Sequence, residues 1–215
     1  MSMKRKSFVG TLAVAATQTA SVSAKNGQNS SVLWDFIIIG SGTAGLPAAI
    51  FASRRGAKVL LIDSAEALGG TLNLANGQVA AAGTRTQIAK GIMDTPDAHY
   101  EDIMRITDGV VDPNIIRKTV DNAPDTINWL LDNGLKPLPD HPVTGSDPGR
   151  PTYRTARYIW GKGQGRDILA VVLKQLAPEL ESGRVVTQLE TDAKELLVSD
   201  DGSVKGVRAQ GPSGE

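Results

Sequence analysis

The stretch from Asp35 to Asp63 reads DFIIIGSGTAGLPAAIFASRRGAKVLLID and decides the fold of this chain. Four apolar residues, Phe36–Ile39, predict a buried strand. The glycine-rich turn Gly40–Gly45 follows, and a helix of small residues comes after it. A second apolar run, Val59–Ile62, predicts another buried strand that leads into Asp63. Strand, turn, helix and strand in this order predict a β-α-β unit with parallel strands.

The glycines of the turn have separate physical roles. Gly40 permits the tight turn, Gly42 lets backbone N–H groups approach a pyrophosphate, and Gly45 lets the helix pack on the strand. The helix N-terminus adds partial positive charge where the phosphates lie. Asp63, 23 positions after Gly40, can accept hydrogen bonds from a ribose. The pattern therefore predicts a dinucleotide site, and a purely structural β-α-β turn is the alternative.

The composition excludes several classes of function. The chain has 215 residues, enough to bury a core in one or two domains. Its 23 basic and 23 acidic residues cancel, so no overall field favours nucleic acid or an anionic membrane. It has no cysteine, which excludes disulfides, thiol catalysis and iron–sulfur ligation within the chain. His99 and His141 are its two histidines, so no metal site is predicted, and we expect both to be structural or solvated.

Residues 1–31 are interpreted as a signal peptide and a linker. Lys4-Arg5-Lys6 precedes a mildly apolar stretch, Val9–Ala20, and Val22-Ser23-Ala24 places small residues where a signal peptidase reads. The basic cluster resembles a twin-arginine signal with lysine in place of one arginine, which predicts export to the periplasm. A basic tail on a cytoplasmic protein is the alternative. No run is long enough to span a bilayer, so no membrane span is expected in the mature chain.

A second glycine-rich stretch follows Asp63. Residues 69–84 read GGTLNLANGQVAAAGT, and nearly all of them are small and uncharged. A solvated loop would carry charges, and a core helix would not carry four glycines. Small uncharged residues suit a backbone that lies against a large flat ligand. A glycine-rich surface loop is the alternative.

The remaining segments predict a scaffold. In chain order they are helices over 95–106, 112–122, 124–133 and 166–176, a strand over 184–189, and a β-hairpin of 195–199 with 204–208. Pro124 is the reason for dividing the second helical segment in two, because proline has no N–H to donate.

The segment 137–165 has many prolines and glycines and little periodicity, and a loop of this length is often functional. It carries Arg150, Arg154 and Arg157, whose guanidinium groups could bind a carboxylate in a two-pronged fork. The alternative, which we favour, is a surface crossover whose arginines stay solvated.

Three features together resemble one family: GSGTAG followed by Asp63, the block over 69–84, and the order of the later segments. They resemble the N-terminal part of the FAD-binding domain of the fumarate reductase/succinate dehydrogenase flavoprotein superfamily. The resemblance implies an α/β fold, a Rossmann-like FAD-binding domain over residues 32–215. Its three layers would include a central parallel sheet and a β-hairpin or meander. The domain is expected to be incomplete at its C-terminus, before the capping domain.

The resemblance also implies which residues bind the cofactor. By position they are Gly40, Gly42, Thr43, Ala44 and Gly45 at the pyrophosphate, Asp63 at the ribose, Gly69, Gly70 and Thr71 along the phosphates, Ala75, Asn76, Gly77 and Gln78 at the isoalloxazine ring, and the backbone of Ala193 at adenine. Asp63 is shorter than the family's usual glutamate, Thr71 replaces asparagine or serine, and Gln78 replaces a glycine. The block holds no histidine where some members attach flavin covalently, so FAD is expected to be non-covalent.

The implied function is that of an FAD-dependent oxidoreductase. It would transfer a hydride between flavin and an activated C–C bond of a small unsaturated carboxylic acid, with a ketosteroid as the rival substrate. No catalytic residue is assigned, because the family's lie further along, and this chain alone is expected to be inactive. An electron-transfer partner is expected. The alternatives are a catalytically silent nucleotide-binding fragment, half of a split protein that needs a complementing C-terminal fragment, or an NAD-binding domain.

Overall fold

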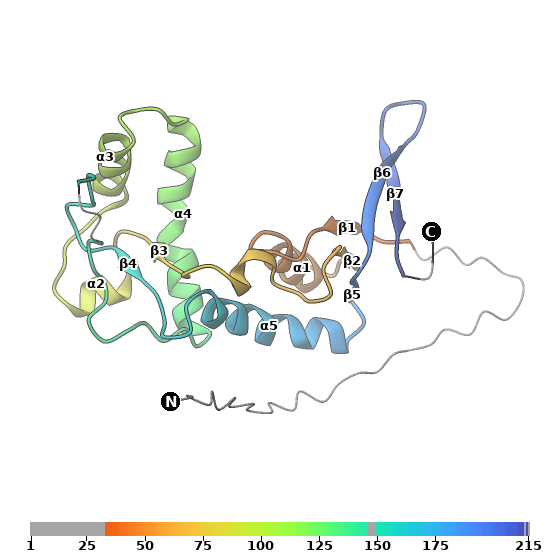
Figure 1. Cartoon of the computed structure of the whole chain (residues 1–215), viewed down its shortest axis with the longest axis horizontal. Helices are drawn as coiled ribbons and strands as arrows, with labels where there is room; N and C mark the ends of the chain where they lie inside the picture. The colour runs from red at the N-terminus through yellow and green to blue at the C-terminus, as the bar shows by residue number, and fades with distance from the viewer. Residues whose placement is uncertain (1–32, 146–148, 213, 215) are drawn as a thin grey trace, which may run out of the picture. The chain divides into compact units, whose positions relative to one another are not determined.

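The structure is a computed structural model that describes residues 33–145, 149–212 and 214. The expected signal peptide and linker, residues 1–31, lie outside the described residues. The chain divides into two units, Met1–Leu33 and Trp34–Glu215. All helices and strands below belong to the second unit (Figure 1).

A parallel sheet of three strands carries the opening motif. Its order is β1 (Phe36–Ile39), β2 (Val59–Ile62), β5 (Val185–Gln188), and each pairs in parallel with the next. Helix α1 (Gly45–Arg54) connects β1 to β2. The predicted β-α-β unit and the predicted strand near residue 185 are therefore confirmed.

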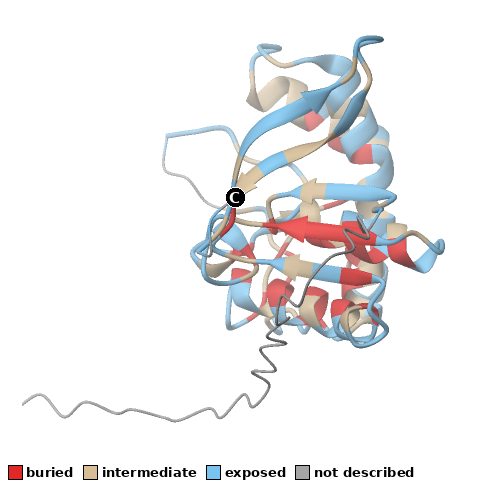
Figure 2. Cartoon of the chain, turned by 90° about the vertical axis from the view of Figure 1, so that its right-hand side faces the viewer, coloured by how far each residue is buried: buried red, intermediate tan, exposed pale blue. Residues whose placement is uncertain are grey.

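The burial of β1 differs from the prediction. All four residues of β2 are buried, whereas Phe36 and Ile39 of β1 are each 55% exposed. Figure 2 shows the buried strand between two strands with exposed residues. Among the described strands β1 has a neighbour on one side only, so the prediction of a buried strand was wrong. An apolar run predicts a strand, but its burial depends on which neighbours cover it.

Helices α1 and α5 (Gly165–Glu181) pack together and both contact the sheet. The α1 residues Leu46 and Ile50 are fully buried, and so is Leu176 of α5. Ser53 of α1 donates a hydrogen bond of 3.1 Å to the buried Glu179 of α5. The predicted helix over 166–176 is confirmed and extends to residue 181.

Two further helices begin at the residues that the sequence predicted, and each has a side-chain cap. The Thr95 side chain accepts a hydrogen bond from the Ala98 N–H (3.1 Å) at the start of α3 (Pro96–Ile106). Asp112 likewise accepts from the Asn114 N–H (2.8 Å) at the start of α4 (Pro113–Asp132). Side-chain acceptors satisfy N–H groups that have no partner within the helix.

Helix α4 is continuous, so the predicted division at Pro124 was wrong. Proline removes one backbone donor from the helix, but the apolar stripe continues on both sides of it. Val120 is fully buried before the proline, and Ile127 (3% exposed) and Leu130 (5% exposed) are buried after it. Packing of this stripe against the core outweighs the local effect of one proline.

Four short elements were not predicted. They are the 3₁₀ helix η1 (Gly70–Asn73), helix α2 (Arg85–Ala89), and strands β3 (Val79–Ala80) and β4 (Tyr158–Ile159). Strands β3 and β4 pair antiparallel and join the glycine-rich block to the long proline-rich segment.

The predicted hairpin is confirmed as β6 (Asp192–Val198) and β7 (Val204–Gln210), which pair antiparallel. Asp201 shapes its turn by accepting hydrogen bonds from the Ser199 hydroxyl (2.7 Å) and the Ser203 N–H (2.9 Å).

Candidate cofactor site

At one position of the turn between β1 and α1, glycine is the only residue that fits. A Cβ on Gly45 would lie 1.8 Å from the carbonyl oxygen of Gly40. Gly40 itself has φ of +97°, which L side chains rarely adopt. A Cβ on Gly42, in contrast, would meet no heavy atom within 4 Å. The backbone at Gly42 therefore faces open space that a ligand can enter.

The same turn presents a row of backbone donors. The Leu46 N–H donates to the carbonyl of Gly42 (3.1 Å), and within the described ranges the N–H groups of residues 42–45 have no acceptor. The first turn of α1 contains no acidic residue. Free N–H groups and the positive end of the helix dipole together favour a bound anion.

Asp63 closes the turn from the end of β2. Its Oδ2 accepts two hydrogen bonds of 2.6 Å, from the N–H and the hydroxyl of Ser41. Its Oδ1 accepts one from the Ala65 N–H at 2.9 Å. Burial alone would raise the pKa of Asp63, but these bonds outweigh it and hold the pKa below its ordinary value. A carboxylate oxygen has two acceptor sites, so Oδ1 retains one for a ligand.

The glycine-rich block lies against the turn and against α5. The Gly69 N–H donates to the carbonyl of Ser41 at 3.0 Å, and a Cβ on Gly70 would lie 3.4 Å from the Cα of Gly42. Further along, a Cβ on Gly77 would lie 2.5 Å from the carbonyl carbon of Gln164. The fold therefore brings the two predicted glycine stretches together.

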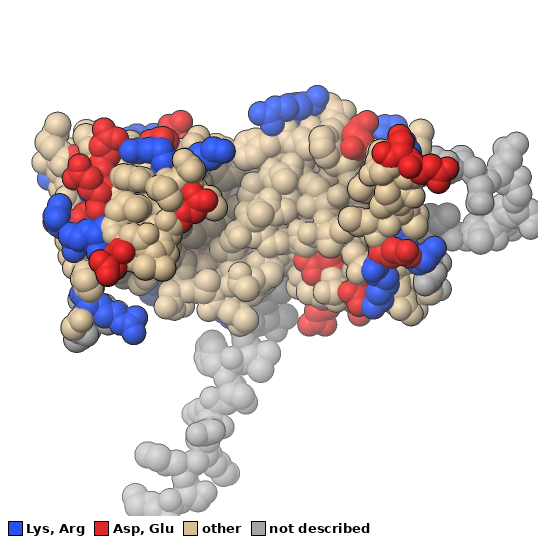
Figure 3. All heavy atoms as spheres, turned by 90° about the horizontal axis from the view of Figure 1, so that it is seen from above, with Lys and Arg blue, Asp and Glu red and all other residues tan. Residues whose placement is uncertain are grey.

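A cavity of about 760 Å³ adjoins both stretches. It is lined by Gly42, Thr43 and residues 75–79, together with side chains of α1, α4 and α5. Those side chains include Phe51 and Trp129, and Asp125 is the one ionisable residue in the lining. Seen from above, the middle of the surface has few charged side chains (Figure 3). We call this space the apolar cavity. The contribution of α4 was missed, because its stripe had been interpreted as scaffold.

A second cavity shares one residue with the first. It measures about 580 Å³ and is lined by Gln78, Thr152, Tyr153, Tyr158 and Trp160 among others. We call it the polar cavity, because hydroxyl and ring side chains dominate this lining. Gln78 therefore lies where the two spaces meet.

Ala193 lies on β6, close to the segment that carries Asp63. The Thr191 N–H donates to the carbonyl of Asp63 (2.8 Å), and the Glu190 N–H donates to that of Ala65 (3.0 Å). The segment before β6 is thus fixed beside the residues that follow β2.

A buried ion-pair network supports the polar cavity. Arg157, with a fully buried side chain, donates two hydrogen bonds to Asp94 (2.6 and 2.8 Å) and one to Asp102 (2.6 Å). Asp102 also accepts from Arg105 at 2.9 Å and from the Arg154 backbone N–H at 3.0 Å. The expectation that the arginines of this loop stay solvated was therefore wrong for Arg157.

The network holds the aromatic wall in place. The Arg157 guanidinium lies 5.1 Å from the centre of the Tyr153 ring, and that ring lies 4.9 Å from the ring of Tyr158. His99 is 3% exposed and packs its edge on Tyr153. Burial, and next the nearby Arg157, lower the pKa of His99 to about 4. His99 is therefore neutral and structural at pH 7.

Residues 35–215 match the family of FAD binding domains. The chain belongs to this family. Its cofactor is FAD, in agreement with the resemblance seen in the sequence.

Two relatives of this FAD-binding domain are named for fumarate. The chain is 34% identical over 175 residues to an NADH:fumarate oxidoreductase of Klebsiella pneumoniae, covering 81% of this chain and 18% of the relative. It is 32% identical over 177 residues to a fumarate reductase (cytochrome) of Shewanella frigidimarina, and the match covers 82% of this chain and 30% of the relative. The chain therefore spans less than a third of either relative.

A solved structure supports the same fold. The open conformation of a flavocytochrome c3 fumarate reductase aligns with a TM-score of 0.72 and 29% identity, over 84% of this chain and 31% of that one. A 3-ketosteroid dehydrogenase of Rhodococcus jostii aligns with a TM-score of 0.66 and 23% identity, over 86% of this chain and 44% of that one. At this identity the likeness shows the fold alone.

No described helix is long and apolar enough to cross a membrane. Residues 33–145, 149–212 and 214 also contain no cluster of three histidine or acidic side chains suited to a metal ion.

Proposed function

We propose that the two glycine stretches and Asp63 hold FAD non-covalently. The observation that carries this proposal is the row of N–H groups over residues 42–45, which faces open space at Gly42 and has no acceptor among the described residues. A pyrophosphate there would receive several hydrogen bonds at the positive end of α1. Gly69, Gly70 and Thr71 would extend this contact, and Oδ1 of Asp63 would accept from the ribose.

The flavin ring is proposed to enter the apolar cavity beside Ala75–Gln78. The size and apolar lining of this cavity suit a large flat ring. Adenine is proposed to lie at the opposite end, against the backbone of Ala193. Backbone contacts fix Ala75 in position, because its carbonyl accepts a hydrogen bond of 3.0 Å from the Gly165 N–H.

The proposed reaction is reduction of the C=C bond of a small unsaturated carboxylic acid. FAD bound in its reduced form would supply a hydride to one carbon of the double bond, and the other carbon would take up a proton. The protein would orient the ring and exclude water from it. Substrate is proposed to approach from the polar cavity, which meets the apolar cavity at Gln78. An acid is favoured over a ketosteroid because the relatives above 30% identity are named for fumarate.

The acid assignment is tested with the FAD-loaded full-length protein. We expect fumarate to reoxidise reduced methyl viologen in its presence, and a 3-ketosteroid to give no reoxidation. Turnover of the steroid without turnover of any unsaturated acid would contradict the assignment.

A complementing segment or chain is proposed as a partner. It is supported by β1, which has one neighbour among the described strands and whose Phe36 and Ile39 are more than half exposed. An apolar strand of a parallel sheet is normally covered on both sides. Export through the twin-arginine-like signal also remains our proposal, and appearance of the tagged protein in the periplasmic fraction would test it.

The ribose contact gives the sharpest test of the cofactor site. The Asp63→Asn variant should bind FAD roughly 10- to 100-fold more weakly, because a charged acceptor contributes about 1.5–3 kcal/mol. FMN, which lacks the adenosine, should lose no affinity. Both dissociation constants are measured by quenching of flavin fluorescence.

Ser41→Ala serves as the matched control, because it removes one bond to Asp63 and keeps the carboxylate. We expect this variant to bind FAD within about threefold of the natural protein. If Asp63→Asn weakened FMN and FAD equally, Asp63 would act by holding the turn and would not contact the ribose.

A further inference from the structure

Three aromatic side chains line the polar cavity. They are Tyr153, Tyr158 and Trp160, and all three are partly buried. The centres of the two tyrosine rings lie 4.9 Å apart. A Cβ on Gly145 would lie 3.1 Å from the Tyr158 ring, so this ring packs on the backbone of the loop. The cavity therefore presents flat apolar surfaces beside its hydroxyl groups.

A second layer of side chains supports these rings. His99 packs its edge on Tyr153 with ring centres 5.1 Å apart, and His141 packs its edge on Trp160 with centres 3.9 Å apart. Both histidines are buried, and their ring nitrogens have no hydrogen-bond partner among the residues that the structure describes. The two imidazoles therefore serve as packing surfaces that hold the cavity rings in place, and a wall held in advance binds a ring at less entropic cost.

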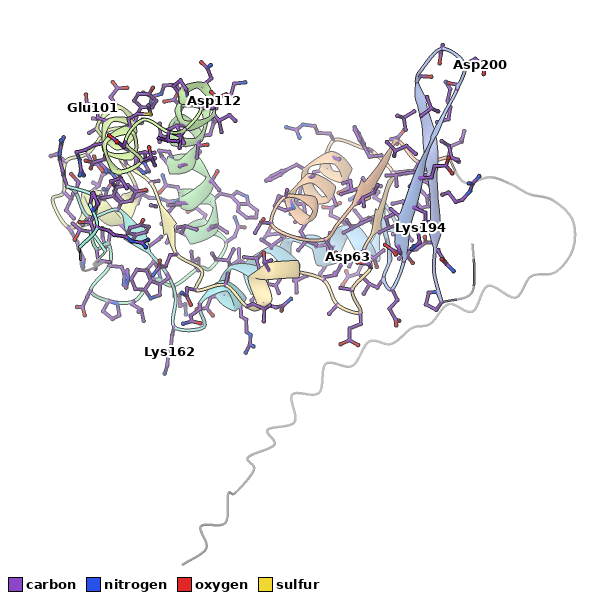
Figure 4. The ribbon with its side chains drawn as sticks, turned by 45° about the horizontal axis from the view of Figure 1, so that its top comes forward. Asp63, Glu101, Asp112, Lys162, Lys194 and Asp200 are labelled. Carbon is purple, nitrogen blue, oxygen red and sulfur yellow. The ribbon has the colours of Figure 1, made fainter. Side chains whose placement is uncertain are left out.

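The lining offers positive charge for one carboxylate. Arg150 is the one charged side chain among the described residues of the lining. A guanidinium has five N–H donors, so it can bind a carboxylate alongside other partners. Burial, and next Tyr158, raise the pKa of Tyr153, so its hydroxyl stays neutral. Glu101 of α3 (Figure 4) is exposed and lies outside the lining.

The cavity has room for more than a four-carbon acid. Its volume of about 580 Å³ falls among pockets that hold drug-sized ligands. It meets the apolar cavity at Gln78, where we place the flavin ring. Fumarate has a carboxylate at each end and no apolar group, so it would leave the aromatic side chains uncovered. A ligand ring packed against them would gain both apolar burial and ring contacts.

We propose that the polar cavity binds the ring of an unsaturated monocarboxylic acid whose C=C bond carries an aromatic group, as in cinnamate. This inference rests on the reaction proposed above. The carbon that bears the ring would receive a hydride from reduced FAD, and the carbon beside the carboxylate would take up a proton from solvent. The products are the saturated acid and oxidised FAD. Hydride adds at the ring-bearing carbon because the carboxylate stabilises negative charge at the other one.

Three acids separate the effect of the ring from the rest of the substrate. Cinnamate is acrylate with a phenyl group, and fumarate is acrylate with a second carboxylate. With the FAD-loaded full-length protein we expect kcat/KM for cinnamate to exceed that for either other acid about tenfold or more. Reoxidation of reduced methyl viologen measures these rates. Dissociation constants for the oxidised protein, which cannot reduce the acids, should follow the same order and are measured from changes in flavin absorption.

Trp160→Leu removes one ring and keeps an apolar side chain. We expect it to lower kcat/KM for cinnamate about tenfold and to weaken cinnamate binding equally, whereas kcat/KM for acrylate should change less than about threefold. Trp160→Phe keeps a ring and should retain cinnamate turnover within about threefold of the natural protein. Tyr100→Leu is the matched control, because Tyr100 lies against Arg117 at 5.1 Å and lines neither cavity.

Equal kcat/KM for cinnamate and acrylate in the natural protein would overturn the assignment of the ring and leave the proposed reaction intact. Equal losses for both acids in Trp160→Leu would also overturn it, because they would show a structural role for Trp160. If Trp160→Leu binds no FAD, Tyr158→Leu takes its place with the same expected results. Turnover of none of the three acids by the natural protein would instead overturn the proposed function.

Discussion

The Gly45→Ala variant is expected to lose both stability and FAD binding. Its Cβ would lie 1.8 Å from the Gly40 carbonyl oxygen and 3.0 Å from the carbonyl carbon, and backbone cannot give way as a flexible side chain can. Helix α1 must shift away from β1, which costs about 3 kcal/mol or more. Urea unfolding and FAD titration measure the two losses separately.

Gly42→Ala is the matched control, because its Cβ has no protein atom within 4 Å. We expect its free energy of unfolding to change by less than about 0.5 kcal/mol. Its FAD affinity should nevertheless fall about 100-fold, because the methyl group would occupy the space where the pyrophosphate approaches. An unchanged FAD affinity in Gly42→Ala would contradict the proposed position of the phosphates.

Arg157→Met is expected to destabilise the domain by about 3–5 kcal/mol. The side chains of Asp94 and Asp102 are only 1% and 2% exposed, so the variant leaves two buried carboxylates without their main partner. A buried ion deprived of its counter-ion costs more than the pair contributes. Thermal and urea unfolding of the FAD-free protein measure the effect.

Arg154→Met tests the same region at the surface. Arg154 lies 3.5 Å from the same Asp102, but its side chain is 65% exposed. We expect its free energy of unfolding to fall by less than about 0.5 kcal/mol, because solvent screens exposed ion pairs. Similar losses in Arg154→Met and Arg157→Met would mean that burial does not set the strength of this network.

The opening motif was predictable because its information is local. The apolar runs over 36–39 and 59–62 and the glycines between them specify strand, turn and helix without reference to the rest of the chain. The starts of the helices at Thr95 and Asp112 were predictable for the same reason.

The errors concern features that depend on distant residues. Arg157 meets Asp94 and Asp102 across more than fifty positions, so no spacing rule marks the pair. Helix α4 continues through Pro124 because buried residues on both sides of the proline pack in the core. Strands β3 and β4 have two residues each and exist only because they pair with one another, so neither shows a periodicity of its own.

In the candidate site, too, the parts that depend on local sequence were predictable and the parts that depend on distant residues were not. The turn and Asp63 were predicted by physical argument, whereas the block over 69–84 was connected to flavin by its composition and by resemblance. The walls supplied by Phe51 and Trp129 became visible only once α1 and α4 were placed beside that block.

The most direct test of this account is the visible absorption of the purified chain after incubation with FAD and removal of the excess. We expect a flavin spectrum with one FAD per chain, and we expect acid precipitation to release all of the flavin into solution. A colourless protein that takes up no FAD would contradict the central claim. Flavin that stays with the precipitate would contradict non-covalent binding.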